Sequence, residues 1–365
     1  MGLQCGIVGL PNVGKSTLFN ALTNAKAQAA NFPFCTIEPN VGVINVPDQR
    51  LTVLEKLVDP EKVQPTTIEI VDIAGLVQGA SKGEGLGNQF LANIRNVDAI
   101  LHVVRCFDDD NITHVHESVE PIRDKEIIDT ELQLKDLDTL QKRLEKANKM
   151  SKSGDKAMAK EAEQLRELID FISEGKSARN FDFDEDFLLN IKDLHLLSMK
   201  PVLYVFNVDE ESAVNGNDYV NNISTLIEKE KAPYLVISAA IESEIIELES
   251  FEERQMFLEE YGLTESGLNK LIKGAYTLLN LITYFTAGKQ EVRAWTIKNK
   301  TKAPGAAGVI HTDFERGFIK AEVISFADYE SLGSEQACKE NGKMRLEGKE
   351  YVVEDGDVMH FKFNV

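Results

Sequence analysis

Long apolar runs are missing from this chain. No stretch of 18 apolar residues occurs in its 365 residues, so no membrane-spanning helix is expected. The segment from Met1 to Cys5 enters an apolar run at once, which leaves no room for a signal peptide. The four cysteines lie far apart and form no C-x-x-C pair, which argues against a disulfide framework or a zinc site. We therefore expect a cytoplasmic protein with no membrane partner.

Positive charge is also scarce. The chain has 40 Lys and Arg residues against 60 Asp and Glu residues, a formal net charge of -20. Proteins that coat nucleic acid are usually basic over the whole domain, so we expect no DNA partner. The length exceeds that of one ordinary hydrophobic core and predicts two or three domains.

Five apolar runs predict the buried strands of a mostly parallel sheet in an α/β fold. Their near-continuous apolar character is typical of strands that are covered on both faces. The runs are Cys5–Val8, Ile68–Ile73, Ala99–Val104, Val202–Phe206 and Tyr234–Ile237. About 95 residues separate the third run from the fourth, more than one crossover requires. This gap predicts an inserted segment.

The inserted segment has helical spacing. Apolar residues recur every three or four positions over 137–147 and again over 158–172. This pattern predicts two antiparallel helices joined near Ser151–Gly154. After about Leu281 the chain changes to short β-rich runs at 293–297, 308–312, 317–324 and 358–363. Gly and Pro turns separate these runs, which predicts a small α+β domain.

Two short stretches are basic within this acidic chain. Residues 142–160 contain seven basic residues against two acidic ones, and residues 289–302 contain five against one. A charge run is usually a solvated face. The alternative is contact with a phosphate backbone, which predicts salt-dependent binding of RNA. The sequence leaves both interpretations open.

A complete phosphate-loop motif follows the first strand. Gly9 to Ser16 read G-L-P-N-V-G-K-S, directly after an apolar run and before a helical one. Such a turn points backbone N–H groups and a helix N-terminus at one small volume, which suits a nucleoside triphosphate. Lys15 is expected to reach the β- and γ-phosphates, and the Ser16 hydroxyl to ligate Mg²⁺. The predicted nucleotide-binding residues of this loop are Asn12, Val13, Gly14, Lys15, Ser16 and Thr17.

Two further segments suit the metal ion and the γ-phosphate. Asp72 ends the second strand and is followed by Gly75, which places a carboxylate near the metal and an N–H group near the γ-phosphate. Thr36 lies in a loop that would become ordered when its hydroxyl joins the metal shell. We therefore predict Ser16, Thr36 and Asp72 as the Mg²⁺ ligands.

The group that activates water is less obvious. Ras-type enzymes place a Gln directly after the D-x-x-G motif, but this chain has Leu76 there, and leucine cannot orient water. The nearest polar candidates are His102 on a core strand and His114 and His116 in an acidic loop. We favour His114 as the catalytic group, together with Lys15 and Gly75. The alternative is that His114 is an ordinary solvated loop residue.

The base-reading segment departs from the guanine pattern Asn-Lys-x-Asp. Here the fourth strand ends in Asn207-Val208-Asp209-Glu210, which lacks the lysine and replaces the aspartate. Asn207 and the backbone of Val208 suit adenine, and Ser238 with Ala239 is expected to form the far wall of the pocket. This predicts ATP over GTP, although Asp209 would read guanine if the loop shifted by one residue.

Taken together, these motifs resemble those of the Obg-like ATPases of the YchF type, a branch of the P-loop GTPases. The resemblance covers nearly the whole length of the chain. The resemblance rests on the phosphate loop, on F-P-F-C-T-I-E-P-N at 32–40, on D-I-A-G-L-V-Q-G-A-S-K-G-E-G-L-G-N at 72–88 and on N-V-D-E at 207–210. The stretch 283–288 is similar to the start of a TGS domain, a β-grasp module. The family resemblance implies a nucleotide-binding domain at 1–130 and 200–280, an inserted helical domain at 131–199 and a TGS domain at 281–365.

The resemblance also implies a function. Members of the family are nucleotide-dependent switches that prefer ATP and associate with the ribosome, through the large subunit or the whole particle, and RNA contact is expected at the two basic stretches. Asn12 matches an asparagine that helps hold an activating K⁺ in related enzymes, so K⁺ is expected beside Mg²⁺. Two other interpretations stay open. One is a GTPase ribosome-assembly factor of the Obg class, and the other is an RNA-binding protein that uses nucleotide only as a structural ligand.

Overall fold

The computed structural model describes residues 3–27, 40–73, 86–116, 118–152 and 154–364. Contacts within the chain divide it into two compact units. The first holds residues 1–42 and 69–271, and the second holds residues 43–68 and 272–365. Among the described residues, no helix combines the length and the apolar character needed to cross a membrane.

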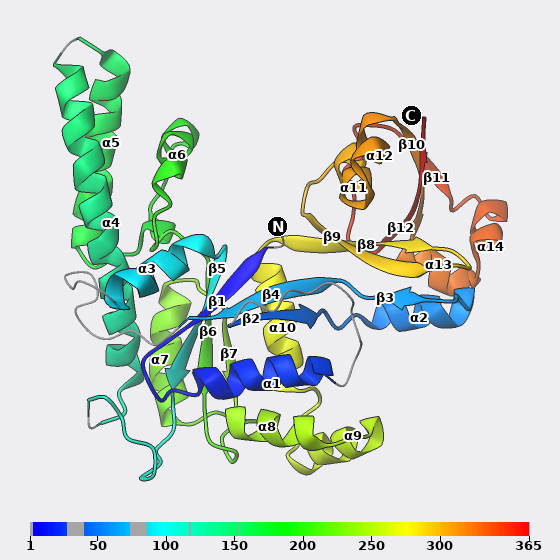
Figure 1. The fold of residues 1–365 in the computed structure, drawn as a ribbon, viewed down its shortest axis with the longest axis horizontal. Helices are drawn as coiled ribbons and strands as arrows, with labels where there is room; N and C mark the ends of the chain where they lie inside the picture. Colours follow the sequence, from blue (N-terminus) through cyan, green and yellow to red (C-terminus); the bar gives the residue numbers. More distant parts are fainter. Residues whose placement is uncertain (1–2, 28–39, 74–85, 117, 153, 365) are drawn as a thin grey trace. The chain divides into compact units, whose positions relative to one another are not determined.

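The first unit is built on a six-stranded sheet with the strand order β2-β4-β1-β5-β6-β7 (Figure 1). All the pairings from β4 to β7 are parallel. The strands are β1 (Gln4–Val8), β2 (Val41–Asn45), β4 (Thr67–Asp72), β5 (Ala99–Arg105), β6 (Val202–Asn207) and β7 (Tyr234–Ile237). Every residue of β5 and β6 is buried, as the apolar runs predict for strands covered on both faces.

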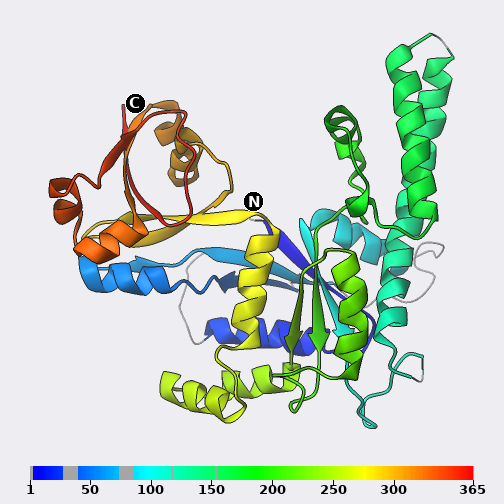
Figure 2. The same ribbon diagram turned by 180° about the vertical axis from the view of Figure 1, so that it is seen from behind.

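Helices cover both faces of this sheet. Helices α1 (Lys15–Ala27) and α8 (Ala239–Glu247) pack on each other, and α4 (Pro121–Ser151) packs on β5 and on α7 (Asp218–Lys229). Figures 1 and 2 show α1 and α8 on one side of the sheet and α3, α4 and α7 on the other. The remaining helices near this sheet are α3 (Leu86–Asn96), α9 (Phe251–Glu260) and α10 (Gly267–Leu278). The carboxyl ends of the central strands lie next to the start of α1.

The inserted segment forms the predicted helical hairpin. Helix α4 runs unbroken for 31 residues, and α5 (Lys156–Ser173) returns alongside it (Figure 1). Leu140, Leu165 and Leu168 are fully buried in the seam between the helices. Near the seam lie α6 (Glu185–Ile191) and two short 3-10 helices, Ala178–Asn180 and Lys192–Leu194. Apolar residues at helical spacing therefore make a core of their own.

A buried carboxylate ties the hairpin to the strand that follows it. Asp136, on α4, is completely buried. Its carboxylate accepts hydrogen bonds from the backbone N–H groups of Leu197 and Ser198 and from the Ser198 hydroxyl, each at 2.7 Å. Burial raises the pKa of Asp136, although these hydrogen bonds oppose the shift. The contact fixes the segment that leads into β6.

The second unit contains a mixed sheet with the order β11-β10-β12-β8-β9-β3. Its strands are β3 (Val63–Gln64), β8 (Leu281–Ala287), β9 (Val292–Lys298), β10 (Phe318–Ser325), β11 (Arg345–Glu347) and β12 (Asp357–Phe363). Tyr284 and Phe285 are neighbours on β8 and belong to different hydrophobic clusters, so the sheet has a core on each face. The helices are α2 (Gln49–Val58), α11 (Ala303–Ile310), α12 (Thr312–Arg316), α13 (Phe326–Leu332) and α14 (Glu335–Glu340).

One element differs from the sequence-based expectations. The run 308–312 was expected to form a strand, which is wrong: residues 303–310 form helix α11, which begins at Ala303-Pro304. Proline suits the first turn of a helix, and the small side chains of Ala303, Ala306 and Ala307 allow close packing on the sheet. Residues 43–68 group with the second unit, because β3 pairs with β9 and α2 packs on β9.

The buried carboxylate of Asp136 yields a stability prediction. We expect Asp136→Ala to lower the free energy of unfolding by about 3 kcal/mol, because it leaves three buried donors without an acceptor. Urea unfolding followed by circular dichroism measures this loss. The matched control is Asp138→Ala on the same helix, whose exposed carboxylate meets only lysines and whose loss should cost less than about 0.5 kcal/mol. Equal losses in the two variants would contradict the role of Asp136.

Candidate nucleotide-binding site

The phosphate loop Gly9–Ser16 leaves β1 and opens helix α1. Gly14 has a φ angle of 99°, and a β-carbon there would lie 2.3 Å from Nδ2 of Asn207. A β-carbon on Gly9 would lie 2.5 Å from the carbonyl oxygen of Val103 on β5. Only glycine fits at these two positions, which explains the spacing of the motif.

A buried lysine belongs to this loop, and an aspartate at the end of β4 is near enough to influence its pKa. Lys15 is 7% exposed, and its Nζ donates to the carbonyl of Leu10 at 2.5 Å. Burial lowers the pKa of Lys15 to about 8, although the charge of Asp72 partly opposes this shift. Asp72 lies at the end of β4, and its Oδ1 is buried with no hydrogen-bond partner in the described part of the chain. Burial raises the pKa of Asp72 against the influence of Lys15.

The unpartnered oxygen of Asp72 suits a cation, because a buried carboxylate oxygen is costly unless something pairs with it. The side chains of Ser16 and Thr17 are exposed at the start of α1. The described ranges contain no group of three or more His, Cys, Asp or Glu side chains that would hold a metal ion by themselves. A metal here would therefore be shared with a ligand, as Mg²⁺ is with phosphates.

Asn207 joins three segments at the carboxyl edge of the sheet. Its Nδ2 donates to the carbonyl of Val13 at 2.9 Å, and its Oδ1 accepts from the N–H of Ala239 at 2.9 Å. Ser238 is the N-cap of α8, so the wall expected from the sequence is the start of a helix. Val208 is buried, and its N–H donates to the carbonyl of Ile237. The structure thus brings the phosphate loop together with both segments expected around the base.

The two carboxylates after Val208 have other partners. Oδ1 of Asp209 accepts from the N–H of Ser212 at 2.9 Å, which closes a local turn. Oε2 of Glu210 lies 3.5 Å from the hydroxyl of Tyr261. Neither carboxylate is held toward the phosphate loop by a hydrogen bond to it in the described residues.

Arg105 organises the loop that carries His114. It ends β5, is 1% exposed and donates to the backbone carbonyls of Phe107 at 3.0 Å, Ile112 at 2.9 Å and Asp109 at 3.3 Å. Its guanidinium also lies over the Phe107 ring, 4.5 Å from the centroid. The sequence analysis missed this residue. An arginine at the end of an otherwise apolar strand was the available signal.

His114 is buried within this loop, not exposed on it. Its Nε2 lies 2.8 Å from Oδ2 of Asp124 in the first turn of α4, and its Nδ1 accepts from the N–H of His116 at 3.1 Å. Nδ2 of Asn12 donates to the carbonyl of Thr113 at 3.1 Å, which places the loop against the phosphate loop. Both ring nitrogens of His114 are therefore engaged close to the expected triphosphate position.

Asp124 is a second residue that the sequence analysis missed. Its Oδ1 accepts from the guanidinium of Arg123 at 3.0 Å, while its other oxygen holds His114. Arg123 in turn donates to the carbonyl of Ser118 and to Glu120. No sequence pattern singles out Asp124, because it is one of many acidic residues in this chain.

The other predicted residues lie elsewhere. His102 is buried on β5 against the ring of Tyr204, and burial lowers the pKa of His102 to about 4, so the ring is neutral at neutral pH. Lys125, Asp129 and Arg179 carry the charges nearest to it. Thr36, Gly75 and Leu76 lie outside the described residues, so the structure says nothing of their places.

Two family models match this chain, one near its N-terminus and one near its C-terminus. A family model described as a 50S ribosome-binding GTPase matches residues 4–136. A second model, for the C-terminal part of YchF GTPases and described as a protein of unknown function, matches residues 281–364. The first match spans the phosphate loop, Asp72 and the His114 loop.

Relatives align with the whole chain. A ribosome-binding ATPase YchF from Bacillus subtilis is 57% identical, and one from Escherichia coli O157:H7 is 54% identical, with 100% of each chain covered in both comparisons. A solved structure of the Schizosaccharomyces pombe YchF GTPase is 40% identical, with a TM-score of 0.90, and covers 99% of this chain and 98% of its own. Sequence and fold agree from end to end, and the chain belongs to the YchF family.

Proposed function

We propose that this protein binds and hydrolyses a nucleoside triphosphate, with ATP preferred over GTP, and that the nucleotide controls its association with the ribosome. The observation that carries the proposal is the buried Lys15 of the phosphate loop, with Asp72, one oxygen of which has no partner, near enough to influence its pKa. This pair suits a triphosphate and its cation. The names of the bacterial relatives, ribosome-binding ATPase, support the choice of ATP and of the ribosome.

The magnesium site is proposed from this chemistry. Ser16 and Asp72, with Thr36 from outside the described residues, would hold Mg²⁺, and the Gly75 N–H would meet the γ-phosphate. When bound, the ion neutralises charge on the β- and γ-phosphate oxygens. We also propose K⁺ near Asn12, whose φ of 61° and hydrogen bond to Thr113 place it between the phosphate loop and the His114 loop.

The preference for adenine is supported by the base-reading edge. One oxygen of Asp209 accepts from the N–H of Ser212 in a local turn, and one oxygen of Glu210, which stands where the guanine pattern has aspartate, lies near the Tyr261 hydroxyl. Asn207 has a second Nδ2 hydrogen beyond the one it gives to Val13, and this hydrogen suits a purine N7. Backbone groups near Val208 and the start of α8 at Ser238-Ala239 would face the rest of the base.

His114 is proposed to position or deprotonate the water that attacks the γ-phosphorus. The proton moves to the imidazole as the bond to the bridging oxygen breaks. Because Asp124 and the His116 N–H occupy both ring nitrogens, the loop must first release the ring. Intrinsic hydrolysis is therefore expected to be slow and to depend on conditions that move this loop.

The hairpin turn is proposed as an RNA contact. Three of its basic residues are paired: Lys142 with Asp138, Arg143 with Glu161 and Lys160 with Asp184. Four other lysines are exposed and make no ion pair within the described residues, namely Lys146, Lys149, Lys152 and Lys156. Unpaired ammonium groups on one tip suit a phosphate backbone.

We assign residues 1–130 and 200–280 to the nucleotide-binding domain, 131–199 to the inserted helical domain and 281–365 to the TGS domain. Residues 43–68, which hold α2 and β3, are an exception to this assignment, because their contacts group them with the second unit. In its basic stretch, Arg293 lies over the Trp295 ring, 3.9 Å from the centroid. This stretch is the second proposed RNA contact. From the proposed association with the ribosome we also infer that the protein is cytoplasmic.

Nucleotide choice tests the proposal directly. We expect a fluorescent ATP analogue to bind at least about threefold more tightly than the GTP analogue, and Lys15→Ala to weaken both by about tenfold or more, because it removes the buried charge that faces the phosphates. Equilibrium titration measures the dissociation constants. Lys142→Ala, on the exposed hairpin surface, is the control and should bind as the unmodified protein does. Tighter binding of GTP would exclude the ATP assignment.

His114 is tested by separating hydrolysis from binding. We expect His114→Ala to slow ATP hydrolysis by about 100-fold, in the range of general acid–base catalysis, with the dissociation constant for ATP nearly unchanged. Phosphate release measures the rate. His116→Ala is the control, because only the backbone N–H of His116 bonds to His114. If the two variants hydrolyse ATP equally fast, His114 has no role in the reaction.

The hairpin contact predicts a change in salt dependence. Replacing Lys146, Lys149, Lys152 and Lys156 by Gln should flatten the plot of log affinity for purified ribosomes against log salt by about 3 units, because each phosphate contact contributes about 0.7 to 0.9. Co-sedimentation at several salt concentrations measures the slope. Lys142→Gln, already paired with Asp138, should leave the slope almost unchanged. An unaltered slope in the fourfold variant would rule out the contact.

A further inference from the structure

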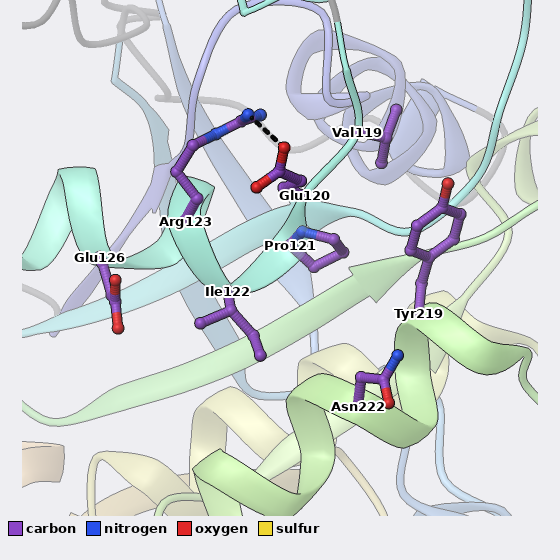
Figure 3. A pocket seen from close by; sticks show the side chains of 8 residues that line it. All are labelled: Val119, Glu120, Pro121, Ile122, Arg123, Glu126, Tyr219 and Asn222. Atoms are coloured by element: carbon purple, nitrogen blue, oxygen red, sulfur yellow. Dashed lines mark hydrogen bonds and ion pairs between the residues drawn. The ribbon is translucent and has the colours of Figure 1, made fainter.

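A groove lies between the first turns of α4 and α7. It is an open hollow with a volume of about 360 Å³. Figure 3 shows the side chains of Pro121 and Ile122 from α4 and those of Tyr219 and Asn222 from α7 facing one another across it. A cavity of this size and lining accepts one or two apolar side chains.

The walls of this groove are fixed before any partner arrives. Pro121 is buried at the start of α4. The hydroxyl of Tyr219 donates to Oδ2 of Asp108 at 2.9 Å, which holds the ring in place. Ile122 is 38% exposed beside this cavity. An apolar anchor entering here would bury Ile122 with little rearrangement.

The charges around the groove are mostly negative. Glu120 and Glu126 line it, Asp108 bonds to its tyrosine, and Asp218 precedes that tyrosine. Of the residues that line the groove, Arg123 is basic, and its guanidinium already donates to Glu120 (Figure 3). It also donates to Asp124 and to the carbonyl of Ser118. This field repels a phosphate backbone and attracts a basic polypeptide. It is the opposite of the lysine-rich hairpin tip.

We propose that this groove is the docking site for a basic segment of a ribosomal protein, which inserts an apolar side chain between Ile122 and Tyr219. This inference rests on the proposed association with the ribosome and adds a protein contact to the RNA contacts. The occupant also meets Arg123, which holds Asp124, which in turn holds His114. Docking is therefore connected to the loop beside the phosphate site by two hydrogen-bonded steps.

A matched pair of substitutions tests the site. Ile122→Glu places a charge in the groove, and Leu134→Glu places one at an equally exposed position of the same helix, 37% against 38%. We expect Ile122→Glu to weaken binding to purified ribosomes by at least tenfold in co-sedimentation, while Leu134→Glu binds as the unmodified protein. Both variants should keep the affinity for ATP. Equal ribosome binding by the unmodified protein and both variants would overturn the docking site but not the proposed association with the ribosome.

Photo-crosslinking identifies the occupant. Asn222 is exposed at the groove, so a photoreactive phenylalanine analogue there should fold and react with whatever docks. With purified ribosomes we expect an adduct to a basic ribosomal protein, lost in the presence of Ile122→Glu. An adduct to ribosomal RNA, or to a second copy of this chain, would overturn the proposal. If the unmodified protein fails to sediment with ribosomes, the proposed function falls together with the docking site.

Discussion

One side-chain amide holds the nucleotide-binding edge together. Asn207 receives an N–H from the start of α8 and gives one to the phosphate loop, so three segments that are far apart in sequence share one orientation. The contact is buried, and Gly14 has no β-carbon that would displace it. Breaking either hydrogen bond of this buried amide would cost free energy, because the freed donor and acceptor would stay buried without water to replace the lost partner. The pocket is therefore preorganised by hydrogen bonds within the protein.

Much of this arrangement follows from the sequence. Continuous apolar runs on both sides of a glycine-rich turn identify the buried strands and the phosphate loop, and helical spacing identifies the hairpin. The run at 308–312 misled because its apolar residues suit either a strand or a buried helix, and Pro304 at the helix start was the better signal. The sequence pattern does not show that residues 43–68 group with the second unit, because that grouping depends on the long-range pairing of β3 with β9.

The electrostatic details could not be predicted in the same way. Arg105, Asp124 and Asp136 act through backbone carbonyls, a histidine and backbone N–H groups brought together only by folding. Spacing along the chain carries no trace of such partners. The sequence left open whether His114 acts in catalysis or is a solvated loop residue. In the structure Arg105 holds that loop through its backbone carbonyls, and the His114 ring is buried. Polar side chains are expected at the protein surface on the basis of composition. This expectation is wrong where a buried charged side chain bonds to the backbone of a loop and holds it in place.

Helix α4 has a mechanical consequence. Its 31 residues form one rod about 46 Å long at 1.5 Å per residue. The foot of this rod carries Asp124, and its far end carries the hairpin turn. A tilt of about 5° around the foot would sweep the far end through about 4 Å, since a lever multiplies angle by length. A displacement too small to break a hydrogen bond near the sheet is thus large enough, at the tip, to change which surface a neighbour meets.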